Sequence, residues 1–429
     1  MVTSEPANIC RVSGDPQAHC EQWLAALPVG SEAMLVVDFE LPQYWLDGSP
    51  SLPLSALYYR DAACLRVAVT QQPLPLDEKA AAAQFEYLVS TRSLLVAVAG
   101  QPVPLVPRPI PKPWGREVWY SAVEQRGVCD AGTEVAQVPL PWLMAALPGG
   151  AYPQPLILLK ILEPDNSAVT GDLYFELHRQ KHEVYVVTHV DQKAWPDGIG
   201  YLRYGFSESK LAQYAGEAAF RAAYLAAVQA YETVRRHIDD QLRGQTPDEG
   251  ILREEASLRA AMDEFTHLMP VTVDQVIYVP PWLPHALQHG VRTVEFQTPV
   301  YEREILSFAQ RVLTQDHWDT ATVVQQMQLL PDVGQTPELL QREPGVLVER
   351  VVDFAEFEVL RIILEPGANF TLSILQAYGL LLILHGEITL GGHVFTAEQG
   401  LWLPGLWSAA VTAPQAAPGL VLLLALPRQ

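Results

Sequence analysis

Two strand-like segments, about a hundred residues apart, constrain this chain more than any other feature. The first runs from Gly171 to Glu183 and reads Gly-Asp-Leu-Tyr-Phe-Glu-Leu-His-Arg-Gln-Lys-His-Glu. The second ends at His285 and reads Val-Pro-Pro-Trp-Leu-Pro-His. Together they supply two imidazoles and two carboxylates, on Glu176, His178, Glu183 and His285. That ligand set suits a divalent metal inside a small β-barrel.

The spacing of these residues favours strands. Residues two apart on a strand point to the same side, so Glu176 and His178 should project together. Glu183 follows a tight turn and could reach back from the neighbouring strand, and prolines hold the backbone before His285 extended. One such histidine alone is more often a surface or core residue. The combined spacing predicts a metal site with one or two positions left for water or substrate.

Composition excludes several other classes of protein. A chain of 429 residues is expected to form two or three domains. A formal net charge of −21 gives no basic footprint, so we expect no nucleic-acid partner. No apolar run approaches the length of a membrane span, and the N-terminus does not resemble a signal peptide. Four cysteines without paired spacing are typical of free thiols, so a cytoplasmic protein is the expectation.

Changes in pattern divide the chain into four predicted parts. Residues 1–105 contain short β-like runs and one predicted helix, an α+β extension of unknown role. Six prolines between 102 and 113 indicate a linker or a lead-in strand. Residues 106–206 and 268–310 are rich in short strand signals and form one predicted barrel. Residues 345–429 form a second β block that repeats the plan of the first.

A helical pair interrupts the first β region over residues 207–267. The Ala-rich run from 208 to 243 has helical periodicity and should end at Gly244. The sequence Thr-Pro-Asp-Glu over 246–249 resembles a capping box that opens a second helix, running to about Phe265.

The metal-binding pattern resembles the two signature motifs of the cupin superfamily. Further segments resemble the type I phosphomannose isomerases, a family with two cupin barrels. These are Lys112-Pro-Trp-Gly, Leu158-Leu-Lys-Ile-Leu162, Lys181-His-Glu183 and Val294-Glu-Phe-Gln-Thr-Pro-Val-Tyr-Glu-Arg303. The resemblance covers roughly 110–429 and implies a mainly β bicupin, two jelly-roll β-barrels with an inserted α-helical segment. It also implies a zinc ion, or another divalent transition metal, held by the four residues above.

Two departures from the family pattern concern this metal site. The family's Gln-x-His-Pro stands here as Glu176-Leu-His178-Arg, so a carboxylate replaces an amide ligand and the proline is absent. Only Arg179 and Gln180 separate His178 from Lys181, where the family has a sizeable loop. The first change adds negative charge around the metal, and the second opens one wall of the pocket.

The resemblance also implies an activity, the interconversion of mannose 6-phosphate and fructose 6-phosphate through an enediol. Arg303 would supply the catalytic cation, Lys181 a second polar group over the metal, and Trp114 a pocket wall, with Glu295 as a further candidate for substrate contact. The simpler readings are a surface ion pair of Arg303 with an adjacent glutamate, a solvated lysine, a core tryptophan and a solvent-facing carboxylate.

Two rival functions stay open at this point. One is a metal-dependent sugar-binding cupin that no longer turns over its ligand, which the shortened loop favours. The other is a different metal cupin enzyme, such as an iron-dependent dioxygenase, because histidines and carboxylates also bind Fe²⁺. The C-terminal β block has Ser408 and Ala409 where a histidine would sit, so we expect no metal there. The predicted partner is a small-molecule sugar phosphate, with no nucleic acid or membrane, and a homodimer is one assembly to test.

Overall fold

The chain is mainly β. A computed structural model describes residues 8–428 except 29, 78, 126, 150–153, 242–246, 311–316, 332–335 and 416–418. Strands account for 42% of the described residues and helices for 20%, with several separate sheets. No helix in the described ranges is long and apolar enough to span a bilayer.

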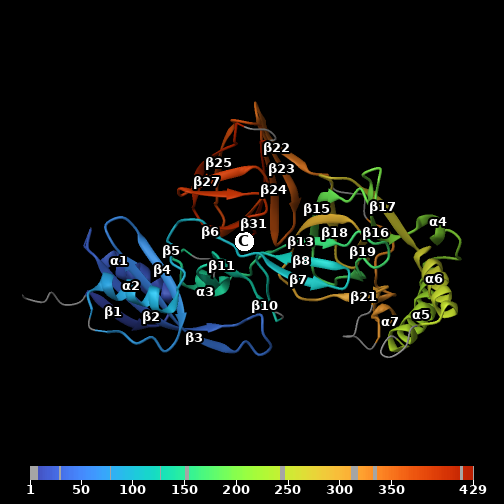
Figure 1. Cartoon of the computed structure of the whole chain (residues 1–429), viewed down its shortest axis with the longest axis horizontal. Helices are drawn as coiled ribbons and strands as arrows, with labels where there is room; N and C mark the ends of the chain where they lie inside the picture. Colours follow the sequence, from blue (N-terminus) through green and yellow to red (C-terminus); the bar gives the residue numbers. More distant parts are fainter. Residues whose placement is uncertain are drawn as a thin grey trace, which may run out of the picture. The chain divides into compact units, whose positions relative to one another are not determined.

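The chain forms two compact units (Figure 1). The first comprises residues 1–108, 119–159 and 337–429, and the second comprises 109–118 and 160–336. The second unit therefore contains both sequence segments that carry the predicted ligands. The four-part division made from the sequence stays a prediction.

Residues 9–98 form a five-stranded sheet with two helices. Its strand order is β1-β2-β3-β4-β5, with β1 and β2 parallel and the other pairs antiparallel. The predicted helix here is α2, and α1 was not predicted, although Asp15 caps it and Pro16 opens it. The elements are β1 Ile9–Ser13, α1 Pro16–Ala26, β2 Ala33–Pro42, β3 Ser51–Arg60, β4 Leu65–Gln71, α2 Ala81–Arg92 and β5 Ala97–Val98.

The proline-rich segment supplies edge strands, as its missing N–H groups require. β6 (Val103–Pro104) is the last strand of the C-terminal sheet, and β7 (Arg108–Lys112) is the last strand of a sheet that carries part of the predicted site. The shorter elements that follow in the first unit are β9 Val123–Glu124, β10 Gly127–Val128, β11 Asp130–Gly132, β12 Gln137–Pro139 and α3 Leu140–Ala146.

Two sheets of the second unit position the predicted ligands. One has the order β18-β15-β20-β13-β8-β7 and the other β17-β16-β19-β14-β21. Their strands, other than β7, are β8 Gly115–Trp119, β13 Leu158–Pro164, β14 Phe175–Leu177, β15 Glu183–Val190, β16 Gly200–Phe206, β17 Thr266–Val271, β18 Val276–Val279, β19 His285–Leu287, β20 Val291–Gln297 and β21 Glu304–Ser307. Glu183 therefore does not lie on a strand paired with the strand of Glu176, as the sequence suggested, but on the other sheet.

The helical insertion differs in detail from the prediction. The first predicted helix is broken into α4 (Glu208–Leu211) and α5 (Glu217–Gln241), with Gly216 at φ +123° before the second piece. Helix α6 (Glu249–Asp263) is capped by Asp248, whose side chain accepts from two backbone N–H groups, in place of the predicted capping box. The predicted helix end at 244 and the first residue of that box, at 246, lie outside the described residues. Helices α5 and α6 pack side by side (Figure 1).

The C-terminal region is built on a seven-stranded sheet with the order β22-β23-β24-β31-β26-β29-β6. Two two-stranded sheets accompany it, β25–β30 and the hairpin β27–β28, and leucine and isoleucine dominate its core. Its elements are β22 Glu338–Glu343, β23 Val346–Asp353, β24 Phe357–Leu364, β25 Asn369–Ser373, β26 Tyr378–His385, β27 Glu387–Leu390, β28 His393–Thr396, β29 Gly400–Pro404, β30 Ser408–Thr412 and β31 Leu420–Pro427. Helix α7 (Thr320–Val323) precedes them in the chain and belongs to the second unit.

Candidate metal centre

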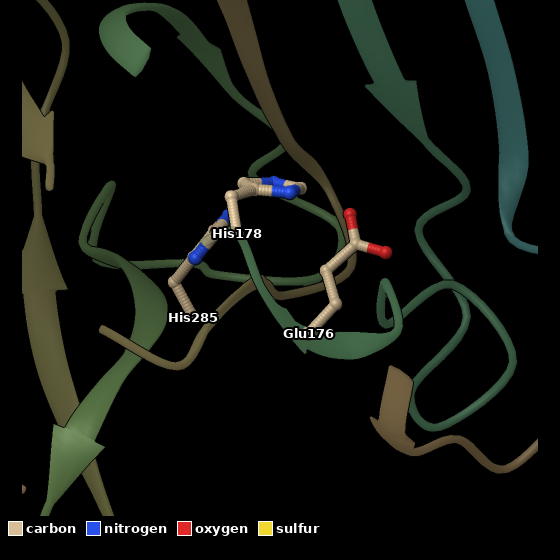
Figure 2. A group of neighbouring side chains, drawn as sticks. All are labelled: Glu176, His178 and His285. Atoms are coloured by element: carbon tan, nitrogen blue, oxygen red, sulfur yellow. The ribbon is translucent and has the colours of Figure 1, made fainter. Parts of the chain in front are cut away.

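Three of the four predicted ligands converge in the second unit. Glu176, His178 and His285 each offer one ligand atom, and these atoms lie within 4.8 Å of one another. Figure 2 shows the three side chains turned toward a common space. Both histidines are nearly fully buried, and Glu176 is partly buried. The structure therefore brings these three predicted ligands together.

Strand pairing explains why these residues meet. Strands β14 and β19 are antiparallel, and Glu176 lies directly opposite His285 in their register. Directly opposite residues place their side chains on the same face of a sheet, within contact distance. His178 follows the last residue of β14 and lies two residues from Glu176, on the same side.

Both imidazoles are held with the same nitrogen facing the cluster. The Nδ1 atom of His178 lies 2.9 Å from the backbone oxygen of Glu302, and Nδ1 of His285 lies 3.1 Å from that of Leu283. A carbonyl oxygen only accepts hydrogen bonds, so each Nδ1 carries the proton and donates it. Each Nε2 is then left with a lone pair, the form in which histidine binds a metal.

The atoms facing the cluster lack hydrogen-bond donors. Within the described part of the chain, Nε2 of His178, Nε2 of His285 and Oε2 of Glu176 are buried and have no hydrogen-bond partner. Buried polar atoms are nearly always paired, so three such atoms in one place require an explanation. Acceptors cannot satisfy one another, whereas a cation between them would satisfy all three. The donor set therefore fits a divalent metal ion.

Glu183, the fourth predicted ligand, reaches the cluster from the other sheet. Its Oε1 lies 3.1 Å from Nε2 of His178, and its Oε2 lies 3.3 Å from Nε2 of His285. Its oxygens also contact Nζ of Lys181 at 3.0 Å and accept a hydrogen bond from the Tyr185 hydroxyl at 2.8 Å. Two sheets thus contribute to one site, which neither could form alone.

The pKa values of the buried candidate ligands are shifted by burial and by the charges around them. Burial alone would raise the pKa of Glu183, but Lys181 and the histidines hold it well below its ordinary value, so the carboxylate stays ionised. Burial, reinforced by Lys181, lowers the pKa of His178 and favours neutral imidazole. Burial would also lower the pKa of His285, but the adjacent Glu183 carboxylate raises it.

The two predicted cations lie at this cluster. Lys181 is buried, and its Nζ lies 3.0 Å from the carboxylate of Glu183. The guanidinium of Arg303 lies 3.9 Å from Glu176 and 5.4 Å from the ring centre of Tyr174, and this side chain is 30% exposed. Arg303 therefore contacts a candidate ligand while it keeps access to solvent.

Glu295, the residue predicted for substrate contact, is buried in the same sheet as Glu183. Burial, with the nearby charge of Glu183, raises its pKa well above the ordinary value, although Lys160 and Lys181 oppose this shift. With its amide nitrogen turned toward them, Gln297 donates to both Glu183 and Glu295. The surroundings therefore shift the pKa values of the two carboxyl groups in opposite directions, down for Glu183 and up for Glu295.

Two polar residues of this site escaped the sequence prediction. Lys160 is only 6% exposed and Gln297 only 1%. The signal for Lys160 was a single lysine within a run of leucine and isoleucine in a strand, since a charge there is rarely buried without a reason. Gln297 lies two residues after Glu295 and shares its side of β20.

Trp114, predicted to form a pocket wall, lies in a hydrophobic core. It is 2% exposed and belongs to the hydrophobic core of the second unit, together with Leu162 and Tyr174. Its function as a pocket wall stays a prediction.

The fold and this cluster define a mainly β protein with a candidate histidine–carboxylate metal site. Comparison with solved structures shows which known proteins have a similar fold. One match is mannose 6-phosphate isomerase from Bacillus subtilis (TM-score 0.52, 12% identity, 76% of this chain and 99% of that one). Another is a zinc-bound mannose 6-phosphate isomerase (TM-score 0.54, 10% identity, 77% and 100%). A third is a variant of phosphomannose isomerase from Salmonella typhimurium (TM-score 0.53, 11% identity, 77% and 100%).

Sequence comparison adds nothing to this likeness. No protein-family model matches the chain, and no curated protein matches it. At 10–12% identity the structural matches show a shared fold and leave the activity to be argued from the site.

Proposed function

We propose that this protein is a metal-dependent aldose–ketose isomerase, with mannose 6-phosphate and fructose 6-phosphate as the first pair to test. The observation that carries the proposal is the convergence of Glu176, His178 and His285, whose ligand atoms lie buried and unpartnered within 4.8 Å of one another. Glu183 completes the proposed ligand set. Zinc is the proposed metal, because a structure of similar fold is zinc-bound.

Isomerisation of an aldose to a ketose moves a proton between neighbouring carbons through an enediol. A divalent metal bound by these ligands would polarise the oxygen of the substrate's carbonyl or hydroxyl group. Arg303, partly exposed beside Glu176, is placed to bind a developing oxyanion or a phosphate group. Lys181 holds Glu183 in position and offers a second cation close to the same atoms.

The proton transfer needs a base, and we assign it to Glu295. A general base works best when its pKa is near the working pH, and burial raises the pKa of Glu295 in that direction. Gln297 donates a hydrogen bond that orients the carboxylate. Lys160 supplies compensating positive charge nearby. This role extends the substrate contact predicted for Glu295 from the sequence.

The likeness to mannose 6-phosphate isomerases also supports a bicupin architecture, in which the second unit carries the metal-binding barrel. The C-terminal sheet would then be the core of the other barrel.

The test combines metal analysis with an activity assay. Untagged protein should contain about one transition metal per chain, and a panel of hexose phosphates should give isomerisation that stops on chelation and returns with Zn²⁺. Bound zinc without turnover would favour the alternative function, a metal-dependent sugar-binding protein that does not convert its ligand. The carboxylate at Glu176 and the two-residue turn between His178 and Lys181 argue for that alternative. Bound iron would favour an oxygenase. If Arg303→Ala leaves isomerisation unchanged, the role assigned to that arginine is wrong.

A further inference from the structure

The short turn between His178 and Lys181 is bound on one side by the segment that precedes β21. Only Arg179 and Gln180 lie between a candidate metal ligand and a candidate catalytic cation. A displacement of this turn would move both residues at once. What holds the turn therefore determines the geometry of the site.

One residue of that segment, Glu302, holds the turn at three points. Its carboxylate oxygen Oε1 accepts hydrogen bonds from the backbone N–H of Gln180 at 2.5 Å and of Lys181 at 3.1 Å. Its backbone oxygen accepts the Nδ1 hydrogen of His178 at 2.9 Å. The next residue along the chain is Arg303, which contacts Glu176.

The segment is also attached to the residue after Lys181. The backbone N–H of Thr298 donates to the oxygen of His182 at 3.0 Å, and its hydroxyl accepts from the N–H of His182 at 3.2 Å. Bonds to charged acceptors are roughly twice as strong as neutral ones, so the carboxylate of Glu302 is the strongest of these attachments.

We propose that Glu302 is a positioning residue of the metal site: its carboxylate fixes the turn that carries His178 and Lys181, and its backbone oxygen fixes the tautomer of His178. This inference rests on the proposed function, since it assigns to Glu302 the support of the proposed ligand and cation. Residues that orient a metal ligand typically change metal affinity by about 10–100-fold when they are removed.

The first experiment needs no metal. Amide hydrogen exchange is measured on metal-free protein for the backbone N–H groups of Gln180 and Lys181. Glu302→Ala should speed their exchange by about tenfold or more, because both lose their acceptor. Glu302→Gln keeps one carbonyl acceptor and should lie between wild type and Glu302→Ala.

The second experiment measures binding of the metal alone. Zn²⁺ affinity is determined by competition with a chromophoric chelator, and the visible spectrum of the Co²⁺-loaded protein reports ligand geometry. Glu302→Ala should bind Zn²⁺ about tenfold more weakly or worse and should shift the Co²⁺ bands, with Glu302→Gln restoring part of both. Glu304→Ala is the matched control: it removes a charge two residues away that pairs with the Arg179 side chain at 2.8 Å. It should leave both readouts near wild type.

The outcomes separate this inference from the proposed function. Unchanged exchange in Glu302→Ala overturns the inference, and so does faster exchange with unaltered Zn²⁺ affinity and Co²⁺ spectrum. An equal effect of Glu304→Ala also overturns it, because charge alone would then explain the result. If wild-type protein binds Zn²⁺ but isomerises no sugar, the proposed function fails while both measurements on Glu302 still decide this inference. If Glu302→Ala does not fold, the same measurements on Glu302→Gln decide it.

Discussion

The six-stranded sheet that carries Glu183 (β18-β15-β20-β13-β8-β7) and the seven-stranded C-terminal sheet both contain antiparallel strand pairs, but the side chains in their interiors differ. In the first, Glu183 pairs with Gln297 and Tyr185 with Glu295, all of them buried. In the second, the neighbouring strands β26 and β31 pair Leu381 with Leu424 and Leu382 with Leu423. Apolar side chains are sufficient to form such a core. The buried carboxylates and amide of the first sheet therefore serve something other than stability.

The energetic contrast supports this conclusion. Fully burying a leucine side chain contributes roughly 1.5–3 kcal/mol, whereas a buried ion pair often contributes less than apolar residues of similar volume. Four polar residues of the site that are not among its proposed ligands are at most 7% exposed: Lys160, Lys181, Glu295 and Gln297. A protein retains such groups where chemistry requires them.

The strongest test of the comparison removes a ligand. His285→Ala should abolish stoichiometric Zn²⁺ binding and, with it, isomerisation, because it deletes one of the three converging atoms. Metal content is measured by elemental analysis after dialysis against trace Zn²⁺. His393→Ala, on an exposed residue of the C-terminal region, is the control and should keep the full metal content. Equal metal loss in both variants would contradict the assignment of the site.

The next effect concerns the proposed base. Glu295→Gln should lower kcat by about 10²–10⁴-fold, the usual contribution of a positioned acid–base group, while metal content stays at the wild-type level. Steady-state kinetics on metal-loaded protein measures this. A variant that loses its metal instead would show that Glu295 supports the ligands and does not move the proton.

The C-terminal sheet should respond in the opposite way. Leu422→Ala removes a fully buried side chain of the apolar core, so the free energy of unfolding should fall by about 2–5 kcal/mol. Metal content per folded chain should not change. Urea unfolding and elemental analysis of the folded fraction give the two numbers, and a drop in metal content would mean that the two regions are coupled.

The smallest effect is a dependence on pH. The pKa of Glu295 in the folded protein lies well above its ordinary value of 4.5, so the folded state keeps a proton that the unfolded chain loses. Wild-type stability should therefore fall as the pH rises above about 4.5, until the pH passes the folded pKa. In metal-free protein, Glu295→Gln removes this cost. Its advantage over wild type in urea unfolding should grow from pH 5 to pH 8, and a constant difference would contradict the shift.

Much of the fold could be predicted from local pattern, with errors where tertiary contacts decide. The residue pattern predicts strands over 291–297 and 420–426; β20 (Val291–Gln297) spans the first range, and β31 (Leu420–Pro427) extends one residue beyond the second. A strand is likewise predicted over 172–178, but β14 covers only Phe175–Leu177, so the candidate ligand His178 lies just beyond its end. The helix predicted over 208–243 breaks before Gly216, which helical periodicity alone did not reveal.

The sequence by itself determined which residues are the candidate metal ligands, because period-two spacing and prolines indicate local strand direction without any long-range contact. It identified Glu176, His178, Glu183 and His285, and it placed Lys181 and Arg303 near them. Only the tertiary structure decided that Glu183 approaches from a second sheet, that Lys160 and Gln297 join it, and that Glu302 holds the turn. The contacts of Glu183 with His285 and of Glu302 with Gln180 join residues more than a hundred positions apart, and strand pairing between such distant segments is set by packing of the whole unit.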